Sequence, residues 1–199
     1  MSEAMAPEAR RAQLLRVSFE LFGERGYHAT TIADIIERAG VARGTFYNYF
    51  ESKRQIFGVL LDELFTAATS AILPISTGAA ADMHRQVFEN IAALCKTLHD
   101  NLPMTRVLLE QAVGLDEEAN LQLRAFYERA LARLQKAIED GQRLGIVRAG
   151  DSAVLATCML GMIKEAVYQQ LLGTQESNIN DQVGEIFAVA ARGFLAVPT

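Results

Sequence analysis

The sequence lacks tryptophan and contains only two cysteines and four prolines among its 199 residues. Cys95 and Cys158 stand far apart, and neither belongs to a CxxC pair, so we expect no disulfide framework and no structural metal site. Both lie in apolar surroundings and are interpreted as buried small hydrophobic residues. A redox-sensing role for Cys95 or Cys158 is the alternative.

Long hydrophobic runs are also missing, since no apolar stretch reaches the roughly 18 residues that a membrane-spanning helix needs. The first residues, MSEAMAPEARR, carry early acids and no apolar segment, which is not the pattern of a secretion signal. The sequence therefore predicts no membrane partner and a cytoplasmic location.

Motifs of common enzymes are absent: the chain has no HExxH, no GxSxG and no glycine-rich phosphate loop. His28, His84 and His99 have no nucleophile or carboxylate at a recognisable spacing. We therefore predict no catalytic residues, no metal ligands and no cofactor. A helical enzyme of unknown reaction is the remote alternative, which a saturable, substrate-dependent rate would revive.

An excess of positive charge is missing too, because the net charge is −5 and the pI about 5.3. The acids are unevenly distributed: residues 1–55 carry eight Lys or Arg against seven acids, and residues 56–199 carry eleven against seventeen. Salt screens charges beyond roughly 8 to 10 Å, so an acidic second half repels a polyanion only weakly. The charge distribution permits nucleic-acid binding by the first quarter of the chain.

Residues 30–50, TTIADIIERAGVARGTFYNYF, contain two short helical patterns separated by a turn. Thr31 and the acid Asp34 three residues later are typical of a helix start, and Gly40 stands where a helix ends in a left-handed residue. A second helical run covers residues 43–49. Two short helices joined by a turn with glycine predict a helix-turn-helix.

The second of these helices separates two faces. Phe46 and Phe50 are four residues apart and are predicted to face the core. The outer face then carries Arg43, Thr45, Tyr47, Asn48 and Tyr49. Such side chains bond to phosphates and base edges, so this surface is interpreted as one that meets DNA.

Residues 14–61 closely resemble the N-terminal DNA-binding domain of the TetR family of bacterial transcriptional regulators. The matching positions, in the family's order and spacing, are Phe22, Gly26, Thr31, Ile35, Ala39, Gly40, Val41, Gly44, Tyr47, Phe50 and Lys53. One family feature is missing, because Ala42 stands where serine often follows the turn valine. This removes a helix cap that contributes about 1 kcal/mol.

Together, the residue types and the resemblance predict the roles of the DNA-binding residues. Arg43 is predicted to contact a base, ideally guanine O6 and N7, with Gly44 allowing close backbone approach. Thr45 and Asn48 assist. The residues expected to hold phosphates are Thr31, Tyr47, Tyr49 and Lys53.

The flanking helices have clear start signals. Pro7 opens a first helix that Gly26 stops, and Tyr27 beyond it either docks on the domain or touches phosphate. Ser52 and Gln55 form a capping box, so that Lys53 lies at the positive end of a new helix, a place that suits a phosphate oxygen. This helix runs on until residues near Pro74 break it. We place the boundary between two domains, 1–52 and 53–199, inside this helix.

The rest of the chain is helical by pattern, without alternating strand segments. Predicted helices cover residues 82–99 and 103–113, then a stretch from Leu123 that Gly145 ends. The next helix starts at Gly150 and Asp151 and is apolar nearly all round, so it must be covered on every side. Asn178 or Asn180 caps the last one. The predicted fold is all-α, with about nine helices: a three-helix DNA-binding domain and a larger helical domain.

The last two helices are the candidate dimer interface, where Gly161, Ala188 and Ala191 would allow close approach. The alternative is that they pack only within one subunit. The family resemblance favours a homodimer, and so does a palindromic target, since two-fold dimers read two half-sites.

The second domain has residues suited to an adaptable apolar cavity: Met104, Leu108, Phe126, Met159, Met162 and Tyr168. They equally suit an ordinary core, but the resemblance implies a ligand cavity among the middle helices. Lys164 and Glu165 are either a polar anchor for a ligand or a rim that faces solvent or the partner subunit. These expectations describe a homodimeric repressor that binds an inverted-repeat operator and is released by a small apolar or amphipathic effector.

Overall fold

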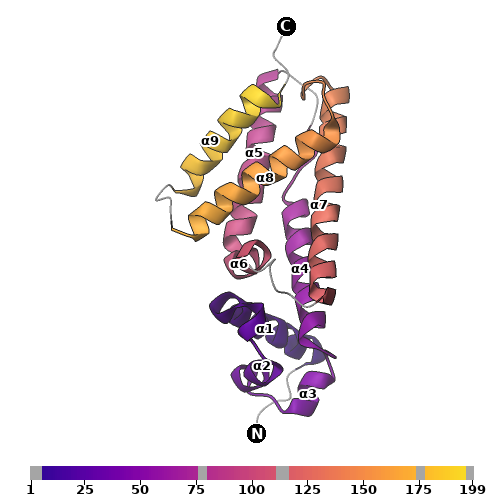
Figure 1. Ribbon diagram of the computed structural model, residues 1–199, viewed down its shortest axis with the longest axis vertical. Coiled ribbons are helices and arrows are strands. Elements are labelled where there is room, and N and C mark those ends of the chain that lie inside the picture. Colours follow the sequence, from indigo (N-terminus) through magenta and orange to yellow (C-terminus); the bar gives the residue numbers. More distant parts are fainter. Residues whose placement is uncertain (1–5, 76–79, 111–116, 174–177, 196–199) are drawn as a thin grey trace. The chain divides into compact units, whose positions relative to one another are not determined.

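The computed structural model describes residues 6–75, 80–110, 117–173 and 178–195 (Figure 1). Within these ranges it contains nine helices and no strand, apart from an isolated bridge between Val147 and Leu195. The prediction of an all-α fold is confirmed. None of the helices in the described ranges is long and apolar enough to cross a membrane.

The chain forms two compact units, each described here by itself. The first comprises residues 1–64 and 101–124, and the second residues 65–100 and 125–199. The divisions fall inside α4 (Lys53–Ser70) and α7 (Glu117–Arg143). The functional boundary expected between residues 52 and 53 stays a prediction.

The first unit is built on three N-terminal helices: α1 (Pro7–Ala29), α2 (Ile32–Ala39) and α3 (Arg43–Tyr47). Pro7 is the first residue of α1, as predicted, and Gly26 has a φ of 82° that breaks the helical path. The start of α4 completes the core of this unit, whose largest fully buried side chains include Phe22, Tyr27, Phe46, Phe50 and Phe57.

Helix α6 (Leu102–Glu110) belongs to the first unit and packs on α1. Gly23 makes this possible, because a Cβ there would lie 2.4 Å from Cβ of Pro103 and 2.9 Å from its Cα. Pro103 is the second residue of α6, one position later than predicted. The predicted continuation of this helix to residue 113 lies outside the described residues.

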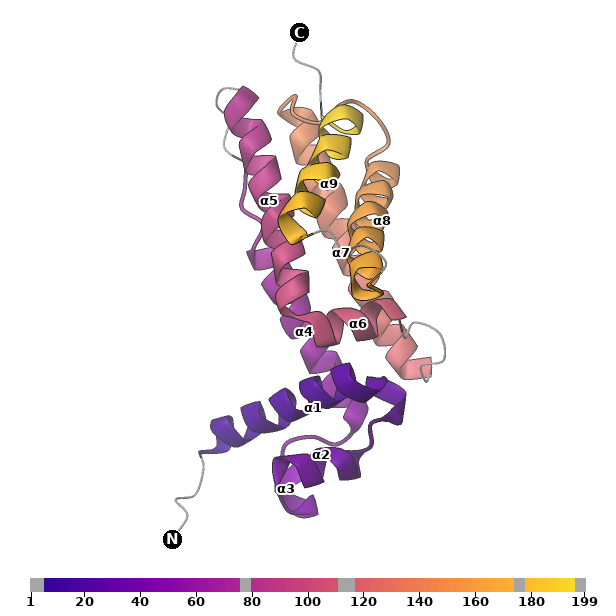
Figure 2. The ribbon, with the colours of Figure 1, turned by 90° about the vertical axis from the view of Figure 1, so that its left-hand side faces the viewer.

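The second unit contains α5 (Ala80–Asp100), α8 (Ser152–Leu171), α9 (Ile179–Gly193) and the remaining parts of α4 and α7. Asp151 caps α8 and Asn178 caps α9, each by accepting two backbone N–H bonds, which confirms the predicted starts. Helices α8 and α9 lie side by side, and both contact α5 (Figure 2).

One expectation about an individual helix was wrong. The recognition helix was predicted over residues 43–49, but α3 ends at Tyr47 and residues 48 and 49 form a turn. The expectation that α8 is covered on every side is not met within this chain, where Val154 is 57% exposed and Cys158 is also exposed. An apolar sequence shows that a helix needs cover, but it does not show that the same chain supplies it.

Candidate nucleic-acid interface

The start of α2 is held by a reciprocal pair of hydrogen bonds. The backbone N–H of Asp34 donates to the Thr31 hydroxyl oxygen at 3.2 Å, and the N–H of Thr31 donates to the Asp34 carboxylate at 2.7 Å. The hydrogen bond from the Thr31 hydroxyl, with help from its N–H and from Arg25, lowers the pKa of Asp34 below its usual range. The predicted helix start is confirmed.

Helix α2 ends as the sequence predicts and is tied to α1. Gly40 adopts a φ of 63° at the end of α2, in the left-handed region that favours glycine. The side-chain amide of Gln13 donates to the carbonyl oxygen of Ala39 at 3.0 Å, and Arg38 pairs with Glu24 at 3.0 Å. The orientation of α2 is therefore fixed from both ends.

Helix α3 is anchored by one buried side chain. Phe46 is fully buried, and its ring lies 6.3 Å from that of Phe50, which is also buried. Ala42 precedes the helix without a side-chain cap, as expected from the missing serine. Because α3 has only five residues, its position depends on this aromatic packing and on the turn that holds it beside α2.

Away from Phe46, α3 and its C-terminal cap present four exposed residues, Arg43, Gly44, Tyr47 and Asn48, which we call the recognition face. The Arg43 guanidinium lies 5.7 Å from the centre of the Tyr47 ring, whose side chain is 43% exposed. A Cβ on Gly44 would meet no atom within 4 Å. The recognition face thus combines the Arg43 guanidinium, the Tyr47 phenol and the Asn48 amide with an unobstructed backbone at Gly44.

The other residues predicted to contact DNA lie around this face. Thr31 is exposed at the start of α2, whereas Thr45 and Tyr49 are half-buried. The structure thus brings the predicted residues of α3 together on one short helix. Their contacts with DNA stay predictions.

Lys53 is directed inward. Its ammonium nitrogen donates to the carbonyl oxygens of Tyr27 at 2.6 Å and of Thr30 at 2.8 Å, and it lies 4.1 Å from the centre of the Tyr27 ring. Tyr27 is 1% exposed, so of the two roles considered for it, docking on the domain is the one that the structure supports. Lys53 braces the corner that leads from α1 into the cap of α2.

Sequence reasoning missed Arg11. This exposed residue of α1 places its guanidinium 5.3 Å from the centre of the Phe50 ring, and so beside the end of the turn that follows α3. The contact joins residues almost forty positions apart, and no local pattern indicates it. Arg11 adds an exposed cation beside the end of the turn that follows α3.

The predicted effector residues are divided between the two units. Met104 and Leu108 are buried in the first unit, on α6. Phe126 is buried in the second, with its ring at 5.8 Å from that of Phe65. Met159, Met162 and Tyr168 are half-buried on α8. An effector role for this set stays a prediction.

Lys164 and Glu165 are both exposed on α8. The Lys164 ammonium lies 5.9 Å from the centre of the Tyr127 ring, and Glu165 accepts a hydrogen bond from Gln169 at 2.6 Å. Burial raises the pKa of Tyr127 to about 12. Of the two roles considered for Lys164 and Glu165, their exposure favours a rim that faces solvent or a partner subunit.

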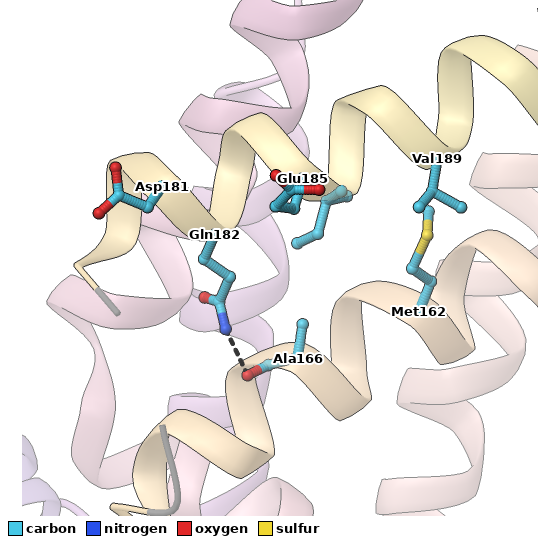
Figure 3. A pocket seen from close by; sticks show the side chains of 7 residues that line it. Met162, Ala166, Asp181, Gln182, Glu185 and Val189 are labelled. Atoms are coloured by element: carbon cyan, nitrogen blue, oxygen red, sulfur yellow. Dashed lines mark hydrogen bonds between the residues drawn. The ribbon is translucent and has the colours of Figure 1, made fainter. Parts of the chain in front are cut away.

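A groove of about 340 Å³ runs between α8 and α9 (Figure 3). Of the predicted effector residues, its lining includes Met162; the other lining residues are Ala166, Asp181, Gln182, Glu185, Ile186 and Val189. Gln182 is buried and donates to the carbonyl oxygen of Ala166 at 2.6 Å. Sequence reasoning placed Ile186 on the apolar stripe of α9 but did not assign Asp181, Gln182, Glu185 or Val189 to a groove.

The two cysteines differ in environment. Cys95 is buried in α5, and burial raises the pKa of its thiol to about 11, so almost none of it is thiolate at neutral pH. Cys158 was also expected to be buried, and that expectation is wrong, because it lies on the uncovered side of α8. Of the two thiols, the one exposed to a dissolved oxidant in this chain is that of Cys158.

The N-terminal part of the chain matches a known family of bacterial regulatory proteins. Residues 14–60 match the sequence profile described as bacterial regulatory proteins of the tetR family. The chain is 29% identical over 144 residues to the HTH-type transcriptional repressor DhaR of Mycobacterium sp. strain GP1, an alignment that covers 72% of this chain and 73% of DhaR.

Two solved structures extend the likeness over nearly the whole chain. A Syntrophomonas wolfei protein assigned to the TetR family superposes with a TM-score of 0.80 at 24% identity, covering 97% of this chain and 100% of that one. The fatty acid degradation regulator FadR of Bacillus halodurans gives a TM-score of 0.77 at 17% identity, with 96% and 98% covered. At these identities the likeness shows a shared fold.

Proposed function

The N-terminal part of this chain belongs to the TetR family of bacterial regulatory proteins, and we propose that the whole chain is a homodimeric transcriptional repressor controlled by a small molecule. The observation that carries the proposal is the recognition face. Its cation, phenol and amide are exposed on a helix whose opposite side is fully buried, next to a helix that is fixed at both ends. Such an arrangement suits insertion into a DNA groove.

In the proposed complex with DNA, some residues contact bases and others contact phosphates. Arg43 reads a base, ideally guanine through O6 and N7, while the open backbone at Gly44 lets the helix approach closely. Thr45 and Asn48 assist. The residues assigned to phosphates are Thr31, Tyr47 and Tyr49, to which we add Arg11 because it lies beside the turn after α3. Lys53 was assigned to phosphate from its sequence position; we now propose that it acts mainly by holding the corner before Thr31.

The DNA target is proposed to be an inverted repeat. A recognition helix of five residues spans about one half-site, and two-fold dimers place two such helices roughly 34 to 36 Å apart, in successive major grooves. The dimer is proposed to form through α8 and α9, which expose apolar side chains such as Val154 and Val189.

The effector is proposed to be an apolar or amphipathic molecule held by residues 53–199. The residue types at the six predicted positions, methionine, leucine, phenylalanine and tyrosine, support this class, and the name of the Bacillus halodurans neighbour suggests an acyl chain. Release requires that the effector bind the DNA-free conformation more tightly, since this difference in affinity sets the shift. The proposal includes neither a reaction nor a cofactor, and it places the protein in the cytoplasm.

Replacing Arg43 by alanine tests the proposal directly. Duplexes selected from a random pool by the wild-type protein provide specific DNA, and unselected duplexes provide the reference. Loss of a bidentate base contact should weaken binding to selected DNA by about 1 to 3 kcal/mol, roughly 5- to 150-fold, with a much smaller effect on unselected DNA. Fluorescence anisotropy at fixed salt measures both affinities.

The matched control is Arg16→Ala, which removes the same charge from an exposed position of the first unit where arginine pairs with Glu20. It should reduce both affinities slightly and equally. If Arg43→Ala behaves like Arg16→Ala on the two kinds of DNA, Arg43 does not read a base. If the wild-type protein selects no duplex at all, the regulator proposal fails.

Replacing Gly44 by alanine should separate folding from DNA binding. The added methyl group meets no atom of the free protein within 4 Å, so the free energy of unfolding should stay unchanged or rise by up to about 1 kcal/mol. Affinity for selected DNA should fall about tenfold if the backbone approaches the groove closely. Glu37→Ala, exposed on α2, is the control. A Gly44→Ala protein that binds as tightly as the wild type would contradict the close approach.

A further inference from the structure

Helix α9 carries an ordered stripe of exposed residues on the side away from its buried face. Asp181, Glu185, Val189 and Arg192 follow one another at intervals of four, four and three residues and are all exposed. The opposite side is buried through Gln182, Val183, Ile186 and Ala190. We call the exposed set the α9 stripe. Intervals of three and four residues place its members in one row along the helix.

The centre of the stripe is apolar. Val189 is 54% exposed and lies with Met162 of α8 at one end of the groove between the two helices (Figure 3). Val189 and the half-buried Met162 give this surface a small apolar centre, and an apolar centre surrounded by polar residues is typical of a protein interface.

The charges of the stripe are separated by sign. Asp181 and Glu185 lie in the N-terminal half of α9, and Arg192 lies in its last turn. Neither Glu185 nor Arg192 forms an ion pair with another residue in the part of the chain that the structure describes. The two ends of the stripe therefore present opposite, exposed charges.

This separation selects one way for two identical stripes to meet. If two copies of α9 packed parallel, Glu185 would face Glu185 and Arg192 would face Arg192, which is repulsive. If they packed antiparallel, each Glu185 would face Arg192 of the second copy, and two-fold symmetry would produce the pair twice. The charge pattern complements itself only in the antiparallel arrangement.

We propose that the partner of the α9 stripe is a second copy of this chain, with the two α9 helices antiparallel and the two-fold axis crossing between residues 188 and 189. This inference rests on the proposed homodimer and specifies its register. Glu185 and Arg192 lie seven residues apart, about 10 Å along the helix, so the axis passes midway between them. The two Val189 side chains then meet at the centre, flanked on each side by one Glu185–Arg192 pair.

Charge reversal tests the register. Glu185→Arg or Arg192→Glu alone places like charges opposite each other twice per dimer, and each should weaken dimerisation about tenfold. The double variant Glu185→Arg/Arg192→Glu restores both pairs with their signs exchanged, and its dimerisation constant should return to within about threefold of wild type. Sedimentation equilibrium at low salt measures the three constants. Arg133→Glu, exposed on α7, is the control and should have no effect.

Cysteine crosslinking tests the same register without altering the charge pairs. In a Cys158→Ser background, Val189→Cys places two thiols beside the axis, within the roughly 7 Å between Cα atoms that a disulfide tolerates, and mild oxidation should link most of the protein into dimers. Asp181→Cys should not crosslink, because antiparallel packing separates the two positions by about 22 Å along the helix. Equal crosslinking at both positions would indicate parallel packing and overturn the proposal.

The outcomes distinguish the register from the dimer itself. A protein that remains monomeric at every concentration would overturn both the homodimer and this contact. A stable dimer that tolerates either single reversal and does not crosslink through position 189 would retain the homodimer but overturn the register. Binding of a small amphipathic cation to the groove of the dimer, with no crosslinking at position 189, would assign the acidic end of the stripe to a ligand instead.

Discussion

Lys53→Met should destabilise the first unit by about 2 to 4 kcal/mol. Methionine keeps the length of the side chain, but it removes both charge-assisted hydrogen bonds, to the carbonyl oxygens of Tyr27 and Thr30, and leaves these buried acceptors without their donor. It also removes the cation from the face of the Tyr27 ring. The corner before Thr31 then loses its brace. Urea unfolding, followed by tyrosine fluorescence, measures the change.

The same variant separates two roles for this lysine. A lysine that only contacted phosphate would leave the free energy of unfolding unchanged and would flatten the salt dependence of binding by about one unit on every duplex. A lysine that positions the corner should lower stability, and specific DNA binding should recover when a stabilising osmolyte refolds the domain. Lys53→Arg keeps the charge and should recover part of the lost stability. An unfolding curve for Lys53→Met that coincides with the wild type would assign Lys53 to phosphate.

Gly23→Ala should destabilise the first unit by about 1 to 3 kcal/mol, although alanine is the better helix former. The new methyl group would lie 2.4 Å from Cβ of Pro103 and 2.9 Å from its Cα, and a backbone atom cannot move aside without moving α6. The variant should therefore unfold at a lower temperature. Its affinity for selected DNA should also fall, because α1 supports α2.

A second substitution provides the control for this clash. Pro103→Gly in the Gly23→Ala background removes the Cβ that the new methyl group would meet at 2.4 Å, so the pair should be less destabilised than the sum of the two single variants, by more than about 0.5 kcal/mol. Gly44→Ala, where the added methyl group has open space, is the matched substitution without a clash. Strict additivity of Gly23→Ala and Pro103→Gly would mean that the two helices are not in contact in solution.

The helix boundaries were the part of the fold that could be read from the sequence, because they depend on neighbouring residues. Thr31 with Asp34, Gly40, Asp151 and Asn178 all act within four positions of themselves, and the structure confirms each of them. The direction of Lys53 could not be read in this way. Its two acceptors lie 26 and 23 positions away, so its helix-start position indicated a phosphate role that its actual contacts do not require.

The sequence also could not predict what covers the apolar surface of α8. The composition of α8 correctly indicated that the helix needs cover, but the exposure of Val154 and Cys158 shows that the described residues of the same chain do not supply all of it. The α9 stripe was missed for a related reason. In the proposed dimer, Glu185 and Arg192 of the stripe form ion pairs only with a second copy of α9. A single sequence contains no signal for such a symmetric partner.

Helix α3 and the residue that follows it separate a buried side chain from a group of exposed ones. Phe46 supplies the packing, whereas Arg43, Gly44, Tyr47 and Asn48 project into solvent and contribute little to the core. Substitutions among these four positions should therefore rarely cause misfolding. If the proposed function holds, a duplicated copy of the gene can change its DNA target through substitutions at these positions while every intermediate stays folded.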